Sequence, residues 1–380
     1  MPDIETLLPD AIKEVHAFWL AGMSCDGCSI AAVGATQPSA ESLMTGNIPG
    51  VPKVNLHHPV LSVYAGAAFI KDFELAANNE LDAPFVIIFE GSVADESKAK
   101  KYGGYWSGLG AREVDGESQP IATADWLARM APHAAAVIAL GTCATWGGIP
   151  AAIGNPTGAM GVADFLGDGY RSTLGLPVVN IPGCAPQGDN FTETVAAVLL
   201  FLQGIGPLPE FDELGRPAWL FGETVHRGCT RAGYYEEGVF AKEYGDKQCL
   251  VEKGCWGPVV QCNINQRGAI NHMGGCMNVG APCIGCTMPG FPDAFSPFYS
   301  TAPGTIVSST ISRTTGFMVR NLRKFSQMYL NKTNKWKKDG KVVSGWGHVR
   351  SPNKLEKAGH YFYEKMQFSN GVKPGVRKIN

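Results

Sequence analysis

The chain has 380 residues, of which 45% are hydrophobic and 17% are charged, and its formal net charge is −2. This composition is typical of a globular protein and excludes a disordered chain, while the length excludes a small disulfide scaffold and suggests two domains. The longest apolar runs, residues 134–140 and 195–202, are far shorter than the roughly 18 to 20 residues that span a bilayer, so we expect no transmembrane segment.

The N-terminal residues and the cysteine content bear on the cellular compartment. The first ten residues include acidic side chains but neither a basic stretch nor a twin-arginine pair, so we expect no export signal and a cytoplasmic protein. A peripheral position at the cytoplasmic face of the membrane, held through partners, is compatible with this. In a reducing compartment, short-spaced sets among the 11 cysteines are more typical of metal sites than of disulfides.

Four apolar, partly β-branched runs in the first half predict buried strands, at residues 15–20, 85–89, 135–140 and 177–181. Helical patterns lie between and after them, including residues 123–130 and 190–202. This alternation is typical of an α/β domain with a doubly wound parallel sheet.

Cysteines follow three of these predicted strands. Cys25 and Cys28 follow the first run, Cys143 follows the third, and Cys184 follows the fourth. Because ligands of open α/β sheets bind in the crevice beyond the carboxyl ends of the strands, we expect these four thiols to converge there. Four thiolates in one crevice can hold an iron-sulfur cluster.

Each part of this set also has another interpretation. The pair Cys25-x-x-Cys28, taken alone, is compatible with a redox dithiol or with half of a zinc site. The turn Gly141-Thr-Cys-Ala is similar to a nucleophile elbow but lacks the G-x-S-x-G pattern. Asp26 lies inside the Cys-x-x-Cys loop, where it is either a turn residue or a carboxylate that replaces one thiolate as a ligand.

The second half, from His226 onward, is dense in cysteine and poor in periodic apolar patterns, so we expect a loop-rich region held together by its metals. The candidate ligands form two sets of four, His226, Cys229, Cys249 and Cys255 in the first and Cys262, Cys276, Cys283 and Cys286 in the second. Two zinc sites could use the same residues, and spacing alone does not choose between the metals. A third four-cysteine set at a sheet edge, on a chain with no acid-base pair or phosphate loop, favours iron-sulfur clusters and electron transfer.

Charge is divided unequally along the chain. Residues 320–380 hold 15 Lys and Arg against three acidic residues, a net charge of +12, which leaves −14 on the first 319 residues. A basic extension of this kind is either solvated or docks on a partner subunit or an anionic membrane surface. It contains none of the named nucleic-acid-binding motifs, so we expect no nucleic-acid partner.

Seven motifs between residues 15 and 299 resemble the small, electron-transfer subunit of nickel-iron hydrogenases. They are Cys25-Asp-Gly-Cys28-Ser, Glu90-Gly-Ser, Gly141-Thr-Cys-Ala-Thr-Trp-Gly-Gly-Ile-Pro-Ala-Ala152, Ile181-Pro-Gly-Cys184, His226-Arg-Gly-Cys229, Lys253-Gly-Cys-Trp-Gly-Pro258 and Pro282-Cys-Ile-Gly-Cys286. The resemblance implies a flavodoxin-like domain at residues 1–205, an iron-sulfur domain at 206–319 and a basic C-terminal extension at 320–380.

The resemblance also implies three iron-sulfur clusters, each 4Fe-4S or 3Fe-4S. Their expected ligands are Cys25, Cys28, Cys143 and Cys184 for the proximal cluster, Cys262, Cys283 and Cys286 with Cys276 as a fourth thiolate for the medial cluster, and His226, Cys229, Cys249 and Cys255 for the distal cluster. Asp26 remains an alternative proximal ligand.

The implied function is electron relay in an obligate heterodimer that oxidises H2. The nickel-iron centre that cleaves hydrogen would lie on a separate large subunit, so we expect no catalytic residue on this chain. Electrons would pass through the proximal, medial and distal clusters to a quinone or an electron-carrier subunit. We also expect the heterodimers to assemble into a higher oligomer.

Several departures from the family pattern indicate which branch of the nickel-iron hydrogenases this chain resembles. Gly27 and Gly148 stand where oxygen-tolerant membrane-bound members have two additional cysteines, so their six-cysteine proximal cluster is not expected. Cys276 occupies a position where many relatives have proline, which allows a 4Fe-4S medial cluster. The missing export signal, the missing C-terminal anchor and the basic extension resemble the high-affinity, actinobacterial-type uptake branch.

Two other functions compete with this interpretation. An iron-sulfur subunit of another quinone-reducing complex would share the first domain but lack the second half rich in histidine and cysteine. A zinc-stabilised interaction protein would use the same thiols without redox chemistry.

Overall fold

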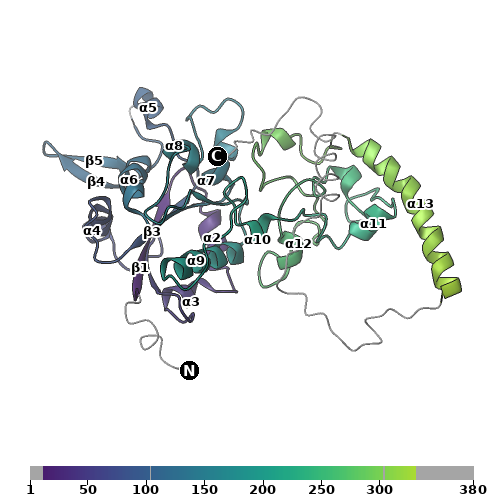
Figure 1. Cartoon of the computed structure of the whole chain (residues 1–380). Helices are drawn as coiled ribbons and strands as arrows, with labels where there is room; N and C mark the ends of the chain where they lie inside the picture. The colour runs from purple at the N-terminus through teal and green to yellow at the C-terminus, as the bar shows by residue number, and fades with distance from the viewer. Residues whose placement is uncertain (1–11, 103, 303, 331–380) are drawn as a thin grey trace.

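The computed structural model describes residues 12–102, 104–302 and 304–330 (Figure 1). Its first half is built on five parallel strands in the spatial order β2-β1-β3-β6-β7. Their bounds are β1 (Glu14–Ala21), β2 (Lys53–His57), β3 (Phe85–Glu90), β6 (Ala136–Leu140) and β7 (Val179–Ile181). With the intervening hairpin set aside, this is the 2-1-3-4-5 order of flavodoxin-like sheets, so the predicted doubly wound, flavodoxin-like fold is confirmed.

The predicted strands at 15–20, 85–89 and 135–140 correspond closely to β1, β3 and β6, but β7 is shorter than the predicted 177–181. Pro177 has no N–H to donate to a neighbouring strand, which is consistent with the later start of β7. Edge strand β2 (Lys53–His57) has no counterpart among the predicted strands, because only two of its five residues are aliphatic. The antiparallel hairpin of β4 (Gly108–Val114) and β5 (Glu117–Ala122) is likewise absent from the prediction, since most of β5 is exposed.

Helices cover both faces of the sheet. On β1, Phe18 and Leu20 belong to one buried cluster and Trp19 to the other, as expected for side chains that alternate across a strand. The first cluster includes residues of α4 (Gly66–Ala77) and α6 (Thr123–Met130), and the second includes residues of α2 (Gly27–Val33), α3 (Ala40–Met44) and α9 (Gly188–Leu202). The predicted helices at 123–130 and 190–202 are therefore present as α6 and α9.

The remaining helices are short, apart from α13. They are α5 (Glu96–Ala99), α7 (Thr142–Trp146), α8 (Val162–Leu166), α10 (Ala218–Phe221), α11 (Ala232–Glu236), α12 (Ile264–Arg267), α13 (Thr305–Leu330) and the 3₁₀ helices η1 (Lys100–Tyr102), η2 (Ala131–His133), η3 (Ile149–Ala151), η4 (Val251–Lys253) and η5 (Asp293–Phe295). Among the described helices, neither α13 nor any shorter one has the length and hydrophobicity to cross a bilayer.

The second half consists mainly of loops, as the sequence predicts, and lies beside the sheet with α13 along its far side (Figure 1). It has its own apolar core, which contains Trp256, Val259, Met277 and Phe295. Residues 320–330 of the predicted basic extension continue α13, and residues 331–380 lie outside the described residues.

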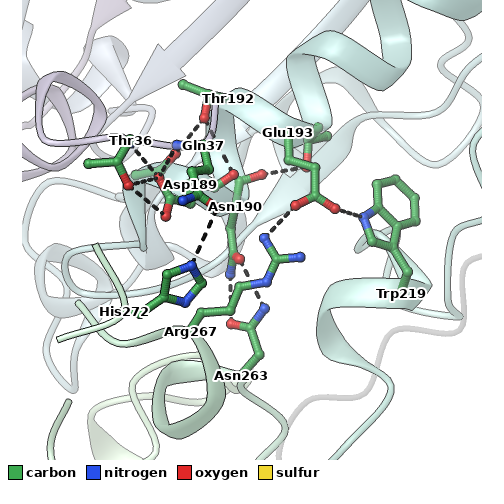
Figure 2. A network of polar contacts seen from close by, with 12 residues as sticks. Thr36, Gln37, Asp189, Asn190, Thr192, Glu193, Trp219, Asn263, Arg267 and His272 are labelled. Atoms are coloured by element: carbon green, nitrogen blue, oxygen red, sulfur yellow. Dashed lines mark hydrogen bonds and ion pairs between the residues drawn. The ribbon is translucent and has the colours of Figure 1, made fainter. Parts of the chain in front are cut away.

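Helix α9 connects the two halves through a polar seam (Figure 2). Asn190 and Asn263 exchange two side-chain hydrogen bonds of 3.0 and 2.9 Å in a buried position. Beside them, the Glu193 carboxylate pairs with Arg267 and accepts a hydrogen bond of 2.7 Å from the indole of Trp219. The same helix that packs on the sheet therefore also holds the loop-rich half.

A buried histidine lies at the end of edge strand β2. The side chain of His57 is only 2% exposed, its Nε2 lies 2.8 Å from Nδ1 of His16, and its Nδ1 lies 3.4 Å from the Asp72 carboxylate. Its ring stacks on Phe18, with centroids 4.4 Å apart. Burial and the neighbouring His16 lower the pKa of His57 to about 4, although Asp72 opposes this shift.

This lowered pKa predicts a pH-dependent contribution to stability. Since the folded protein resists protonation of His57 while the unfolded chain accepts a proton near pH 6.5, the contribution is complete above pH 6.5 and is lost as the pH falls toward 4. We expect His57→Phe, which retains an aromatic ring on Phe18, to reduce the decline in the free energy of unfolding across this range. Denaturant titrations of the purified protein at several pH values measure this free energy of unfolding. His133→Phe serves as the control, and an undiminished decline in His57→Phe would contradict the assignment.

Candidate metal centres

The first cysteine set lies at the carboxyl ends of the parallel strands, where β1 and β3 flank the point at which the strand order reverses. Cys25 follows β1, Cys28 is the second residue of α2, Cys143 lies in the first turn of α7, and Cys184 follows β7. The loops after β1 and β3 are joined by a backbone bridge between residues 23 and 92. The crevice at such a reversal is the usual ligand site of this fold.

Three of the four thiols, those of Cys28, Cys143 and Cys184, have a pKa that is shifted by other thiols of the set. Burial raises the pKa of Cys28, and the neighbouring charges of Glu90, Cys143, Cys25 and Cys184 raise it further. Burial also raises the pKa of Cys143 and of Cys184, and Cys25 contributes to both shifts. Ionised thiolates at such a site are unfavourable unless cations neutralise them, so this donor set fits an iron-sulfur cluster, which is held by cysteine thiolates.

Two glycines allow the backbone to approach these sulfurs. Gly141 has a φ of +89°, and a Cβ at this position would lie 2.4 Å from the Cys28 sulfur. Gly148 has a φ of +55°, and a Cβ there would lie 2.8 Å from the Cys143 sulfur. Any larger residue at either position would therefore displace a candidate ligand as well as strain the backbone.

Asp26 has the left-handed backbone conformation of a turn residue, with a φ of 59°, at the N-cap of α2. Its side chain makes no capping hydrogen bond, and its amide donates to the Ser24 hydroxyl at 3.0 Å. This conformation agrees with the turn interpretation. The alternative role of its carboxylate as a metal ligand stays a prediction.

The second candidate set gathers around η4. Burial raises the pKa of Cys249 to about 12, and the charges of Cys255 and Cys229 add to the shift. His226 is adjacent to this group, because its carbonyl accepts the Cys229 amide at 3.1 Å and its own amide donates to the Gly257 carbonyl at 3.0 Å. Burial lowers the pKa of His226, which favours the neutral imidazole that binds metals.

The third candidate set lies between the other two. Burial raises the pKa of Cys262 and of Cys286 to about 12, and the charge of Cys276 contributes to both shifts. Cys283 is fully embedded, and its raised pKa reflects burial first and then the charges of Cys255, Cys286 and Cys262. The structure thus brings the exposed Cys276 near the half-buried Cys262 and Cys286.

The backbone amide of Arg231, two residues after Cys229, donates to the Cys229 sulfur at 3.4 Å. The backbone two residues further along the chain also opposes the rise in pKa of four other thiols, those of Cys249, Cys255, Cys262 and Cys283. Hydrogen bonds to sulfur are among the means by which proteins set cluster reduction potentials. Within the described part of the chain, no three His, Cys, Asp or Glu side chains lie close enough to share a single metal ion.

Two hydrogen bonds connect neighbouring sets. The hydroxyl of Thr142, next to Cys143 of the first set, donates to the carbonyl of Cys286 in the third. The amide of Cys283, also in the third set, donates to the sulfur of Cys255 in the second at 3.3 Å. The three sets therefore form a continuous series in which the third occupies the middle.

Sequence reasoning did not identify Glu90 as a functional residue, although it belongs to the motif Glu90-Gly-Ser. This carboxylate is 1% exposed, and it accepts hydrogen bonds from the Cys28 amide at 3.0 Å, from the Trp19 indole at 2.9 Å and from the Ser29 hydroxyl. An acidic residue at the end of the otherwise apolar strand β3 was the available signal.

Two family models match the chain. Residues 221–299 match the model described as the C-terminal part of the NiFe/NiFeSe hydrogenase small subunit. Residues 25–198 match the model described as the 20 Kd subunit of NADH ubiquinone oxidoreductase. The first match covers the second and third candidate sets, and the second match covers the first set.

Individual hydrogenase small subunits and one solved hydrogenase structure match a larger part of the chain than either family model does. The chain is 31% identical over 300 residues to the periplasmic NiFeSe hydrogenase small subunit of Desulfomicrobium baculatum, covering 78% of this chain and 91% of the relative. It is 33% identical to the hydrogenase-2 small chain of Escherichia coli K12, covering 72% of this chain and 66% of the relative. Among solved structures, an actinobacterial-type NiFe-hydrogenase from Ralstonia eutropha H16 has a TM-score of 0.81 and 46% identity, with coverage of 93% of this chain and 99% of that chain.

The close approach at Gly141 predicts a loss of bound metal on substitution. We expect Gly141→Ala to lower the metal content of the purified protein by at least half, because the new Cβ would displace the Cys28 sulfur. The matched control is Gly167→Ala, which has a similar φ of +85° but open space around the added atom. Metal analysis of both variants by mass spectrometry separates the contact from backbone strain. Equal losses in the two variants would show that the contact with the thiol is irrelevant.

Proposed function

Because the chain belongs to the small-subunit family of nickel-iron hydrogenases, whose members transfer electrons, we propose that three iron-sulfur clusters on its cysteine sets form the transfer path. The H2-cleaving site of these enzymes lies on the large subunit with which the small subunit pairs. Family members bear iron-sulfur clusters, and for this chain we propose both the number of clusters and the residues that hold each one.

The proposed ligands follow the three groups described above. The proximal cluster is assigned to Cys25, Cys28, Cys143 and Cys184, the medial cluster to Cys262, Cys276, Cys283 and Cys286, and the distal cluster to His226, Cys229, Cys249 and Cys255. Asp26 is the alternative ligand in the first group. When bound, such clusters accept and release electrons at potentials between about −700 and +450 mV.

The contacts between the sets carry this proposal. The Thr142 hydroxyl on the Cys286 carbonyl joins the proximal group to the medial one, and the Cys283 amide on the Cys255 sulfur joins the medial group to the distal one. These contacts support an order in which the medial group receives electrons from the first half and passes them onward.

His226 is proposed to distinguish the exit site from the others. Its imidazole is neutral, so it adds no negative charge to a group that otherwise contains three thiolates. Replacing a charged ligand by a neutral one raises a reduction potential, which draws electrons toward the exit. We propose a quinone or an electron-carrier subunit as the acceptor.

The remaining assignments concern assembly. We propose a flavodoxin-like domain at residues 1–205, an iron-sulfur domain at 206–319 and a basic extension at 320–380, with an obligate heterodimer as the building block of a higher oligomer. We further propose a cytoplasmic protein that partners hold peripherally at the membrane, although the named relatives include a periplasmic enzyme.

The competing assignment to another quinone-reducing complex has a specific basis in the match of residues 25–198 to the 20 Kd subunit of NADH ubiquinone oxidoreductase. That match covers the first half alone. The hydrogenase match at residues 221–299 accounts for the second half, so hydrogenase is the better assignment.

The proposal predicts the metal content of the purified complex. Three clusters of three or four irons require about 9 to 12 irons on this chain, together with the brown colour of iron-sulfur proteins. Metal analysis of anaerobically purified material, combined with electron paramagnetic resonance during a redox titration, measures both number and type. Zinc in place of iron, with no visible absorption, would support the zinc-stabilised alternative.

The role of His226 is tested by His226→Cys. A fourth thiolate should lower the potential of the distal site, and a tenfold change in the one-electron equilibrium corresponds to 59 mV. We expect reduction of the physiological acceptor to slow by about tenfold, while hydrogen-deuterium exchange at the large subunit stays unchanged. His133→Cys is the control for adding a thiol elsewhere. Unchanged turnover with the physiological acceptor would count against the assignment.

A further inference from the structure

A continuous series of hydrogen bonds joins an exposed loop to the first cysteine set. The backbone amides of Val60 and Leu61 both donate to Nδ1 of His58, at 3.1 and 3.3 Å. With Nδ1 acting as acceptor, Nε2 carries the proton and donates to the Ser29 oxygen, 2.9 Å away. The Ser29 hydroxyl in turn donates to Glu90. Every proton in the series therefore has a defined place.

The series ends on a carboxylate that is surrounded by donors. Oε1 of Glu90 accepts the Cys28 amide, and Oε2 accepts both the Trp19 indole and the Ser29 hydroxyl. All three partners are donors, and a carboxylate is an acceptor-only group that can receive all of them. None of the ion pairs formed by the described residues includes Glu90, so only hydrogen-bond dipoles offset its charge.

The charge of Glu90 reaches the metal site. Oε1 of Glu90 accepts the amide of Cys28 at 3.0 Å, so the carboxylate lies against the backbone of a proposed ligand. A negative charge at this place disfavours an added electron on a cluster held by that ligand. At 1% exposure, little water is available to screen it.

We propose that Glu90 is a positioning residue that lowers the reduction potential of the proximal cluster, with Ser29 and His58 fixing its carboxylate against the Cys28 amide. The inference rests on the proposed function, because it requires a cluster on the first cysteine set. It adds a residue that would influence the reduction potential of the cluster without being a ligand. That residue is Glu90, a buried carboxylate without an ion-pair partner among the described residues, and the loop that contains His58 sets its orientation.

The charge is tested with Glu90→Gln in the purified complex of both subunits. This change removes the negative charge and keeps the side-chain size, so the reduction equilibrium of the proximal cluster should shift about tenfold toward the reduced form. That shift corresponds to 59 mV for one electron. Glu90→Asp retains the charge and should restore most of the original potential. Asp82→Asn removes the same charge from a fully exposed side chain ahead of β3 and is the matched control.

Ser29→Ala separates this electrostatic role from simple disruption of the site. Removing the hydroxyl donor leaves the carboxylate less compensated, so the potential should move in the opposite direction, about threefold toward the oxidised form. Structural damage would move both variants in the same direction. The direction of the potential shift expected for Ser29→Ala does not depend on the result for Glu90→Gln. Ser29→Ala therefore still tests the proposal if the Glu90→Gln variant does not assemble into the complex.

The measurement is a redox titration followed by electron paramagnetic resonance, with iron content determined on the same samples. Opposite shifts in Glu90→Gln and Ser29→Ala with full iron content would support the inference. Unchanged potentials, or shifts in the same direction, would overturn it while leaving the proposed function intact. A wild-type complex without iron on this chain would overturn the proposed function instead.

Discussion

The crowding of buried thiols is the constraint on which the rest of the structure depends. In each of the three sets burial raises the pKa of a thiol, Cys28 in the first, Cys249 in the second and Cys262 in the third, and neighbouring thiols add to the effect. A cysteine group of this kind is stable in its ionised form only when bound metal compensates the charge, so we expect metal binding and folding to be coupled. The loop-rich second half, with few helices and a modest apolar core, is the part in which this coupling is expected to matter most.

The sequence predicted the centre of the sheet well because β1, β3 and β6 are buried on both faces and appear as continuous apolar runs. It did not predict β2 or the β4-β5 hairpin, whose residues are largely polar or exposed, since their positions depend on pairing with strands elsewhere in the chain. Local patterns carry information about burial, whereas pairing partners are determined by tertiary structure.

In the candidate site, too, local features could be predicted from the sequence, whereas contacts between distant segments could not. Cys25, Cys143 and Cys184 could be grouped from the sequence, because each follows a predicted parallel strand and such ends converge. The hydrogen bond from the Thr142 hydroxyl to the Cys286 carbonyl joins residues 144 positions apart, and no local pattern indicates it. Glu90 was present in a family motif, but its three hydrogen-bond donors lie on β1 and α2, which are distant from it in the sequence.

The polar seam along α9 has a consequence for the speed of electron transfer. Asn190 and Glu193 anchor the loop-rich half directly onto the helix that packs against the sheet, and the first and third thiol sets lie on opposite sides of this junction. Since tunnelling rates fall steeply with separation, a small sliding movement between the halves would slow the relay without altering any ligand. The contacts of Asn190 and Glu193 thereby help to keep the distance between these two thiol sets constant.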